Sequence, residues 1–255
     1  MKSRTLITLL LISIAVTTAT AQKAKHFEVG LQGGYGSHWI INQNNYGLPE
    51  LDYQPIGGAG FNFQLGYNFT EEIGLFTEIG MTKQGQGYTD DNFTYPGLGL
   101  QDATVDRTVN LDYLNIPVFF KYSYGESRAR FRLMVGPQFS FLQKAEQEYL
   151  INEVDIAGQY SSTNKENESF DVGARDIEER FNSMDIAFVM DLGADIFVME
   201  NMLYLSAGAR LFYGLTDINA SSYQMDNYDG NYDPSHNAGG TFYLGLHYII
   251  AGKAK

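Results

Sequence analysis

The chain has 255 residues, with 17 Lys and Arg against 30 Asp and Glu, a formal net charge of −13 and no cysteine. The lack of cysteine excludes disulfide scaffolds, zinc-ribbon sites and thiol catalysis. The acidic balance argues against nucleic acid as a partner, because phosphates require a basic face. Gly, Tyr and Phe are abundant, at 27, 18 and 17 residues, which is typical of a protein built of strands and turns.

The first 21 residues have the three parts of an export signal. Lys2 and Arg4 form a basic start, an apolar run follows, and Ala19-Thr20-Ala21 supplies a small-x-small cleavage site. The apolar run is too short for a membrane-spanning helix, which takes ~20 residues. We therefore expect a cleaved signal peptide over 1–21 and one exported domain over 22–255. Removal of the two basic residues leaves the mature chain at −15.

Apolar and polar residues then alternate with period two, which predicts β-strands. The clearest stretches begin at Phe61, Phe131, Ile186, Leu203 and Phe242. Weaker versions run from Phe27 to Trp39, from Ile73 to Met81 and from Leu114 to Tyr122. The pattern as a whole predicts eight strands.

The connections between these stretches are short and long in strict alternation. The short ones are Thr70-Glu71-Glu72, Gly125-Glu126-Ser127 and Met199-Glu200-Asn201, and the long ones are 41–55, 88–108, 143–183 and 217–239. In an antiparallel meander, this order places every long loop at one end, as in barrels with short periplasmic turns and long extracellular loops. The predicted fold is therefore all-β: an eight-stranded antiparallel up-and-down transmembrane β-barrel in the outer membrane.

The acidity is confined to the long loops. They hold twenty acidic and five basic residues, so they carry the whole −15 of the mature chain, while the remaining segments are neutral. We expect an uncharged barrel whose outer end alone is acidic.

A soluble up-and-down barrel such as a lipocalin also alternates, but its apolar face points inward. The polar face decides between the two classes, because it carries few charges and many glycines: Gly30, Gly34, Gly66, Gly80, Gly136, Gly193, Gly208 and Gly245. Small residues suit the crowded interior of a narrow barrel. Aromatic residues also gather at the strand ends, where they can form interfacial girdles: Trp39, Phe139, Phe141 and Tyr213 towards the long loops, and Phe27, Phe69, Tyr122 and Tyr248 towards the turns. The sequence therefore favours the membrane barrel, with outer-membrane lipid as its surroundings.

Eight charged residues have the parity of the barrel interior: Glu78, Lys121, Arg130, Arg132, Asp185, Asp191, Asp195 and Arg210. Buried charges must be paired, and four acids here balance four bases. We expect a structural ion-pair network that fills the lumen, with a gated ion path as the alternative. A general porin is disfavoured because eight strands enclose no open channel.

Two weaker candidates lie outside this set. Asp229-x-Asn231-x-Asp233 resembles the start of a calcium loop, but Pro234 stands in place of the required glycine. A solvated loop is the preferred interpretation. His38 beside Ser37 leaves open a lipid-modifying enzyme, although no motif fixes a triad. We expect no enzyme activity and no catalytic residue, cofactor or metal.

The loop 143–183 is the best candidate for a partner site. It carries ten acidic residues, and loops on a rigid scaffold usually carry function. Asp176 and Arg180, spaced i, i+4, favour a short helix from Asp176 to Phe181. The alternative is a solvated cap at the cell surface that acts only by electrostatic repulsion.

The segment from Leu111 to Tyr122, LDYLNIPVFFKY, resembles the "YLxIPxxxKY" strand of the PorT-like outer-membrane barrel family of Bacteroidetes. Val135-Gly136-Pro137 and the segment 213–218 (YGLTDI) resemble later motifs of that family. The resemblance implies an outer-membrane barrel and, through the family's namesake, an association with protein secretion or gliding. Fold alone does not transfer that role. We therefore expect a monomer with a structural or interaction role, possible partners being other envelope or surface proteins.

Overall fold

The computed structural model describes residues 25–41, 52–95, 100–126, 128–151, 175–199, 202–224 and 230–250. The predicted signal peptide lies outside these residues. The strands are β1 (His26–Ile41), β2 (Asp52–Asn68), β3 (Ile73–Tyr95), β4 (Leu100–Glu126), β5 (Ala129–Ile151), the short β6 (Arg175–Asp176), β7 (Met184–Met199), β8 (Leu203–Gly214) and β9 (His236–Ile250). Two 3₁₀ turns, η2 (Glu178–Arg180) and η3 (Ser221–Tyr223), lie in the connections. No helix among the described residues is long and apolar enough to cross a membrane.

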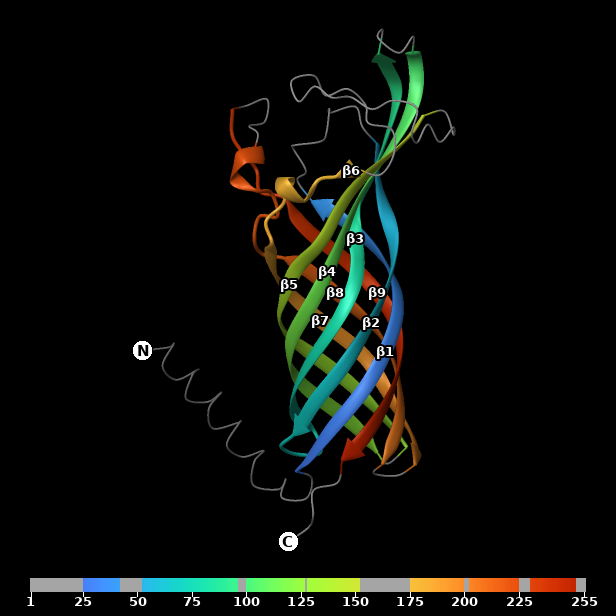
Figure 1. Ribbon diagram of the computed structural model, residues 1–255. Helices are drawn as coiled ribbons and strands as arrows, with labels where there is room; N and C mark the ends of the chain where they lie inside the picture. Colours follow the sequence, from blue (N-terminus) through green and yellow to red (C-terminus); the bar gives the residue numbers. More distant parts are fainter. Residues whose placement is uncertain are drawn as a thin grey trace, which may run out of the picture.

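The eight long strands form one closed antiparallel ring (Figure 1). Each pairs with the next long strand along the chain, and β1 closes the ring with β9 in a register that runs from Phe27↔Ile250 to Ile41↔His236. The predicted eight-stranded up-and-down barrel is confirmed. The strand ends that the three predicted short turns connect lie at one end of the barrel, as expected.

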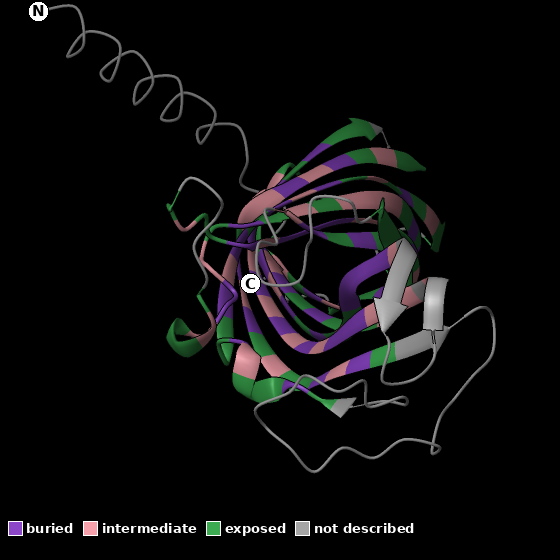
Figure 2. Ribbon diagram, turned by 90° about the horizontal axis from the view of Figure 1, so that it is seen from above, coloured by how far each residue is buried: buried purple, intermediate pink, exposed green. Residues whose placement is uncertain are grey.

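The two faces of the barrel wall differ in polarity. On β1, Phe27, Leu31 and Tyr35 are exposed on the outside, whereas Glu28 and Gln32 are buried inside. The same alternation gives the striped strands seen along the barrel axis in Figure 2. An exterior of exposed Phe, Leu and Tyr around a polar interior is the inverse of a soluble barrel and suits a lipid environment.

Exposed aromatic side chains lie near both ends of the apolar exterior. Trp39, Phe141 and Tyr213 lie towards the long connections, and Phe27, Phe69, Tyr122 and Tyr248 towards the short turns. Phe139, also predicted for the outer girdle, is half-buried. Aromatic girdles at these levels are typical of transmembrane barrels.

Inward-facing glycines make room for large interior side chains. A Cβ added at Gly66 would collide with the Phe76 ring, and one added at Gly136 would collide with the carbonyl oxygen of Val118. The narrow barrel therefore requires glycine at positions where a strand is in close contact with an interior side chain or with a neighbouring strand.

Two of the predicted long loops are in large part strand. The segment 88–108 was expected to be a loop, but β3 continues to Tyr95 and β4 begins at Leu100; β5 likewise extends to Ile151. In Figure 1 these three strands rise above the rest of the barrel. The physical reason is that Val109 and Leu111 on β4 and Ala145 on β5 are fully buried there, so the extension has its own apolar core.

That core closes the outer mouth of the barrel. Ile177, Phe181 and Ile218, from the two connections after β5 and β8, pack against the inner face of the strands. The wall contributes Ile40, Tyr88, Val109, Leu111, Tyr113 and Ala145. We call these nine residues the apolar plug. The predicted short helix near Asp176–Phe181 is confirmed only in part, as the single 3₁₀ turn η2, because Asp176 lies in β6 and Arg180 bonds to Gln147. The neighbours of η2, Ile177 and Phe181, belong to the plug.

Candidate functional site

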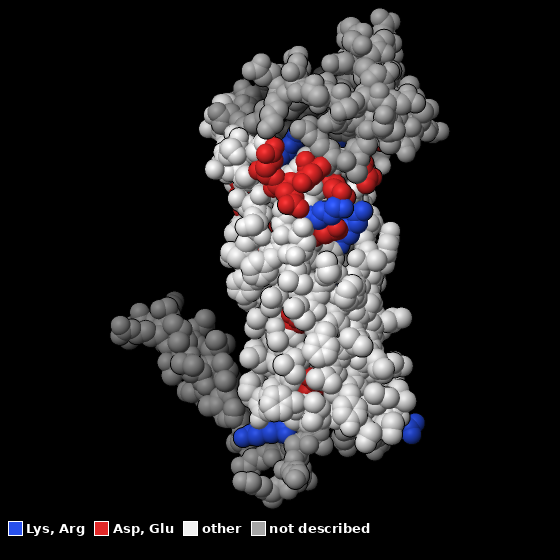
Figure 3. Space-filling view, viewed as in Figure 1, with Lys and Arg blue, Asp and Glu red and all other residues white. Residues whose placement is uncertain are grey.

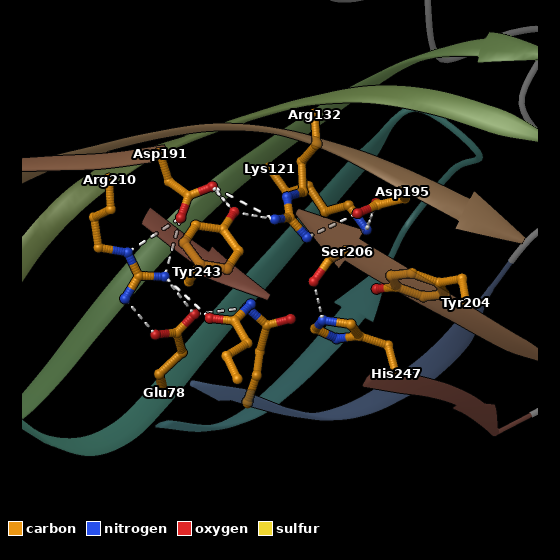
Figure 4. A network of polar contacts seen from close by, with 12 residues as sticks. Glu78, Lys121, Arg132, Asp191, Asp195, Tyr204, Ser206, Arg210, Tyr243 and His247 are labelled. Carbon is orange, nitrogen blue, oxygen red and sulfur yellow. Dashed lines mark hydrogen bonds and ion pairs between the residues drawn. The ribbon is translucent and has the colours of Figure 1, made fainter. Parts of the chain in front are cut away.

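An alternating chain of acids and bases runs through the lumen below the apolar plug (Figure 4). In order, its seven members are Glu28 (β1), Lys121 (β4), Asp195 (β7), Arg132 (β5), Asp191 (β7), Arg210 (β8) and Glu78 (β3). We call these residues the lumen network. Because its members come from six different strands, the network ties opposite walls of the barrel together.

Arg210 anchors one end of the lumen network. Its two terminal nitrogens donate to the Glu78 carboxylate at 2.7 and 2.9 Å, and the guanidinium also reaches Asp191 at 3.1 Å. Gln64 donates a further hydrogen bond to Glu78 at 2.7 Å. The Glu78 and Asp191 side chains are fully buried, so these contacts replace their hydration.

Arg132 links the middle of the network. Its Nη1 donates to Asp195 at 2.9 Å, and its Nη2 lies 3.6 Å from Asp191. The Tyr243 hydroxyl accepts from Arg132 and donates to Asp191 at 2.6 Å. Tyr243 therefore bridges the guanidinium and the carboxylate inside a space closed to solvent.

Lys121 and Glu28 form the inner end. The ammonium lies 3.3 Å from Glu28 and 3.8 Å from Asp195, and it sits 4.5 Å from the centre of the Phe76 ring. Glu28 also accepts from the Tyr204 hydroxyl at 2.7 Å and from the Asn68 amide at 2.6 Å. His26 Nε2 lies 2.8 Å from the same carboxylate, so Glu28 is satisfied by four neighbours from four strands.

Six of the eight residues predicted for the interior are brought together in this network. Arg130 is not among them: it lies at the inner strand end, half-buried, 3.9 Å from the exposed Glu71 of a short turn. Asp185 is also separate, because it lies at the outer end beneath the plug and bonds to neutral Thr216 and Asn237. Parity predicted that both side chains point inward, but their position along the strand separates them from the network.

The predicted balance of four acids and four bases is therefore wrong for the network. It has four acids and three bases, because Glu28 joins it while Arg130 and Asp185 do not. The inward position of Glu28 could have been predicted from the sequence, because Glu28 follows the outward-facing Phe27 and is separated by an even number of residues from the inward-facing Gln32.

The residues considered for catalysis are not assembled into a catalytic site. Ser37 faces outward and His38 inward, because consecutive residues of a strand point to opposite faces. A different pair, Ser206 and His247, is hydrogen-bonded at 2.8 Å inside the lumen. His247 is fully buried and stacks on Tyr204, and its other ring nitrogen has no partner among the described residues. A nucleophilic pair needs an oriented base and access to substrate, and this pair has neither, so we assign it a packing role.

The described part of the chain holds no group of three or more His, Cys, Asp or Glu side chains able to bind a metal ion. In the calcium-like segment, Asn231 and Asp233 belong to the described residues, whereas Asp229 lies outside them.

Two connections, those that follow β5 and β8, form the outer cap, and Asp217 holds the second of them together. Its carboxylate accepts four hydrogen bonds: two from the backbone N–H groups of Asn219 and Ser235 at 3.0 and 3.1 Å, and two from the side chains of Tyr232 and Gln224 at 2.6 and 2.9 Å. Burial, together with the bond to this carboxylate, raises the pKa of Tyr232 to about 12. Tyr232 is therefore a neutral donor at physiological pH.

The backbone joins the same two connections directly. Asn182 donates its N–H to Ile218 at 2.7 Å, and Ala220 donates to Arg180 at 2.9 Å. The Asn182 side chain adds bonds to the carbonyls of Asp217 and Asn219. The described segments after β5 and β8 thus form one cap, anchored below by the apolar plug.

Acidic side chains gather on this cap, above a largely uncharged band that covers the barrel wall (Figure 3). Those nearest η2 are Glu146, Glu148, Asp176, Glu178 and Glu179. The plug and the lumen network pack the barrel interior at two levels, so the geometry supports a rigid scaffold that displays an acidic outer surface.

Known proteins resemble the chain in family and fold. The family model described as "Outer membrane protein beta-barrel domain" matches residues 20–220. None of the curated proteins matches the chain. Similar solved structures include Neisserial surface protein A (12% identity, 88% of this chain and 97% of that one, TM-score 0.43) and OprG of Pseudomonas aeruginosa (9%, 91% and 100%, 0.42). The outer membrane protease OmpT of Escherichia coli is similar to a comparable degree (12%, 91% and 98%, 0.40).

These structural likenesses, at such low identities, concern the fold alone. The family match covers most of the chain, and it agrees with the closed barrel and its apolar exterior. The chain therefore belongs to the outer membrane protein beta-barrel domain family and is a protein of the outer membrane.

Proposed function

We propose that the protein is a monomeric, non-enzymatic barrel that binds a partner in the cell envelope or at the surface through its acidic outer cap. The observation that carries this proposal is the cap itself: exposed acidic side chains stand on the connection after β5, which is fixed by backbone hydrogen bonds to the connection after β8 and by the apolar plug. A rigid scaffold with functional loops is the usual division of labour in such folds.

The charge of the cap indicates the chemistry of the partner. Around η2, the cations Lys144 and Arg180 are already engaged, with Glu146 at 2.6 Å and with Gln147 at 3.3 Å. Glu178 and Glu179 are exposed. The adjoining segment 152–174 adds five acidic residues and one basic residue. A protein that presents a basic surface fits this end of the barrel.

The test compares two matched pairs of substitutions at opposite ends of the barrel. The first variant carries Glu178→Lys and Glu179→Lys on the cap; the control carries Glu71→Lys and Glu72→Lys on an inner turn, where both residues are also exposed. A third variant replaces 152–174 by a short Gly-Ser linker, which keeps β5, β6 and Ile177. Crosslinking in intact cells, followed by purification, should yield a partner with the wild type and the inner control that the two cap variants lose. Equal recovery with all four proteins would refute the proposal.

A role in secretion or gliding is the second candidate, and it is supported by the resemblance of the segment from Leu111 to Tyr122 to the PorT-like strand. A secretion or motility defect in a deletion strain, restored by the wild type and not by the cap variants, would favour it. A lipid-modifying enzyme is the third. Loss of an activity on outer-membrane lipid on His38→Ala substitution would favour that class, although the inward position of His38 argues against it.

A further inference from the structure

His26 is the first residue of β1 and lies at the inner end of the barrel, beside the last acid of the lumen network. Its Nε2 is 2.8 Å from Oε1 of Glu28. The His26 side chain is 17% exposed, whereas that of Glu28 is only 5% exposed. His26 is therefore a titratable group that contacts a buried carboxylate and still reaches the solvent on the side of the short turns.

The polar groups around His26 and its partner carboxylate come from four strands: Glu28 on β1, Asn68 on β2, Lys121 on β4 and Tyr204 on β8. Lys121 and Tyr204 contact the second oxygen of Glu28, at 3.3 and 2.7 Å. Lys25, which precedes His26 in the chain, is exposed to solvent. The last pair that β9 makes with β1 adds only the apolar Ile250. Glu28 is therefore the anion that His26 contacts, and it is shared with Lys121.

The short contact identifies the ring nitrogen of His26 that carries a hydrogen. An ionised carboxylate can only accept, so a nitrogen 2.8 Å from Glu28 is a donor. Asn68 Nδ2 donates to the same oxygen at 2.6 Å, and the two nitrogens lie 3.0 Å apart because both point their hydrogens at it. A proton added to the ring therefore goes to Nδ1. It converts the contact with Glu28 from a neutral to a charge-assisted hydrogen bond without moving either group.

The lumen network lacks one positive charge. Its four acids contact three bases, so one negative charge among these buried side chains is uncompensated. An uncompensated buried charge is costly, because the interior solvates it less well than water does. An imidazolium at His26 supplies the missing charge at the position where the network reaches the solvent.

We propose that His26 is the proton-binding residue of the lumen network and makes the inner end of the barrel sensitive to pH. Imidazole is the side chain that titrates in the neutral range, at about pH 6.5 outside any fold. A protonated His26 gains an ion pair with Glu28 that the unfolded chain lacks. This stabilisation is therefore present at low pH and is lost as the pH rises. Because Glu28 also contacts β2, β4 and β8, the added charge strengthens the attachment of the start of β1 to the opposite wall.

The experiment compares heat-modifiability midpoints of the full chain in detergent micelles at about pH 8 and about pH 5.5, on either side of the imidazole range. His26→Gln keeps a neutral N–H donor for Glu28 but cannot take up a proton. We expect the advantage of the wild type over His26→Gln to grow on acidification by on the order of 3 °C. His26→Lys is charged at both pH values, so its advantage over His26→Gln should be the same at both. The other three histidines are common to all three proteins, so the comparison isolates His26.

Two outcomes of this comparison would overturn the proposal: an advantage of the wild type that does not change with pH, or a midpoint of His26→Lys no higher than that of His26→Gln. A second measurement does not depend on whether the variants fold. In ¹⁵N NMR of the wild type, the His26 ring should carry its hydrogen on Nε2 at about pH 8 and a hydrogen on both nitrogens at about pH 5.5. A ring that stays neutral throughout, or carries its hydrogen on Nδ1 at the higher pH, would equally refute the assignment.

Discussion

The replacement of Arg210 by alanine is the sharpest test of the lumen network. The side chain is only 11% exposed and holds two carboxylates, Glu78 and Asp191, that are completely buried. After the change, Glu78 retains the hydrogen bond from Gln64, and Asp191 retains those to Tyr243 and, at 3.6 Å, the Arg132 cation. Two buried anions would then share one guanidinium and two neutral donors.

The cost follows from the loss of one partner of a buried pair, which typically destabilises a protein by about 3–5 kcal/mol. For a chain of this size, each 1 kcal/mol corresponds to about 2–4 °C in the midpoint of thermal unfolding. We therefore expect Arg210→Ala to lower the midpoint by on the order of 10 °C. Arg210→Lys keeps the charge but not the bidentate contact with Glu78, so its midpoint should lie between those of the alanine variant and the wild type.

The assay is heat modifiability: the temperature at which the folded band on a gel gives way to the unfolded one. Arg130→Ala is the matched control, because Arg130 pairs at 3.9 Å with a Glu71 side chain that is 62% exposed, and such pairs contribute about 0–1 kcal/mol. A midpoint for Arg210→Ala equal to that of Arg130→Ala would refute the claim that the network stabilises the barrel.

Two further predictions concern the cap and the wall. Asp217→Ala removes the acceptor of four hydrogen bonds in the cap. We expect limited proteolysis to cut the cap of this variant at least tenfold faster, while the heat-modifiability midpoint of the barrel stays within a few degrees of wild type. An unchanged cleavage rate would contradict the role given to Asp217. Gly136→Ala should reduce the folded yield on dilution from urea into micelles, because its Cβ would meet the Val118 carbonyl. Gly33→Ala, whose Cβ would have no atom within 4 Å, is the control and should fold as the wild type does. Equal yields for the two variants would show that the strands at Gly136 can shift to admit a Cβ, against the prediction.

Strand number and wall polarity were predictable because a period-two pattern is a local property of the sequence. Phe61, Phe63 and Leu65 are exposed outside, and Gln64 between them is buried inside. Strand ends were harder to predict. The segment 88–108 is polar enough to suggest a loop. The residues that flank its strands, Tyr88 at its start and Val109 just after it, are buried in one cluster with Ile177, which lies about seventy residues beyond Val109 in the chain.

The interior charges show the same division between local and long-range information. The alternation along each strand predicted correctly that the Arg210 and Glu78 side chains face the lumen. It does not predict at which height along the barrel axis each side chain lies. That level depends on the tilt and stagger of the closed barrel, which bring Arg210 of β8 within 2.7 Å of Glu78 of β3. Asp185 shows the consequence, because it points inward and yet lies at the level of Thr216 rather than of any arginine.

The distribution of charge in the structure supports a function at the outer surface. The lumen network places its acids and bases in direct contact, so the charges inside the barrel hold its strands together. On the cap, Glu178 and Glu179 are instead held exposed by a short turn whose neighbours Ile177 and Phe181 are buried in the plug. Glu179 accepts one exposed hydrogen bond, from the Tyr223 hydroxyl at 2.8 Å, while the neighbouring like charges of Glu178 and Glu179 repel one another. Because the fold gains little from them, the proposed recognition of a partner of opposite charge would account for their display at one end of the barrel.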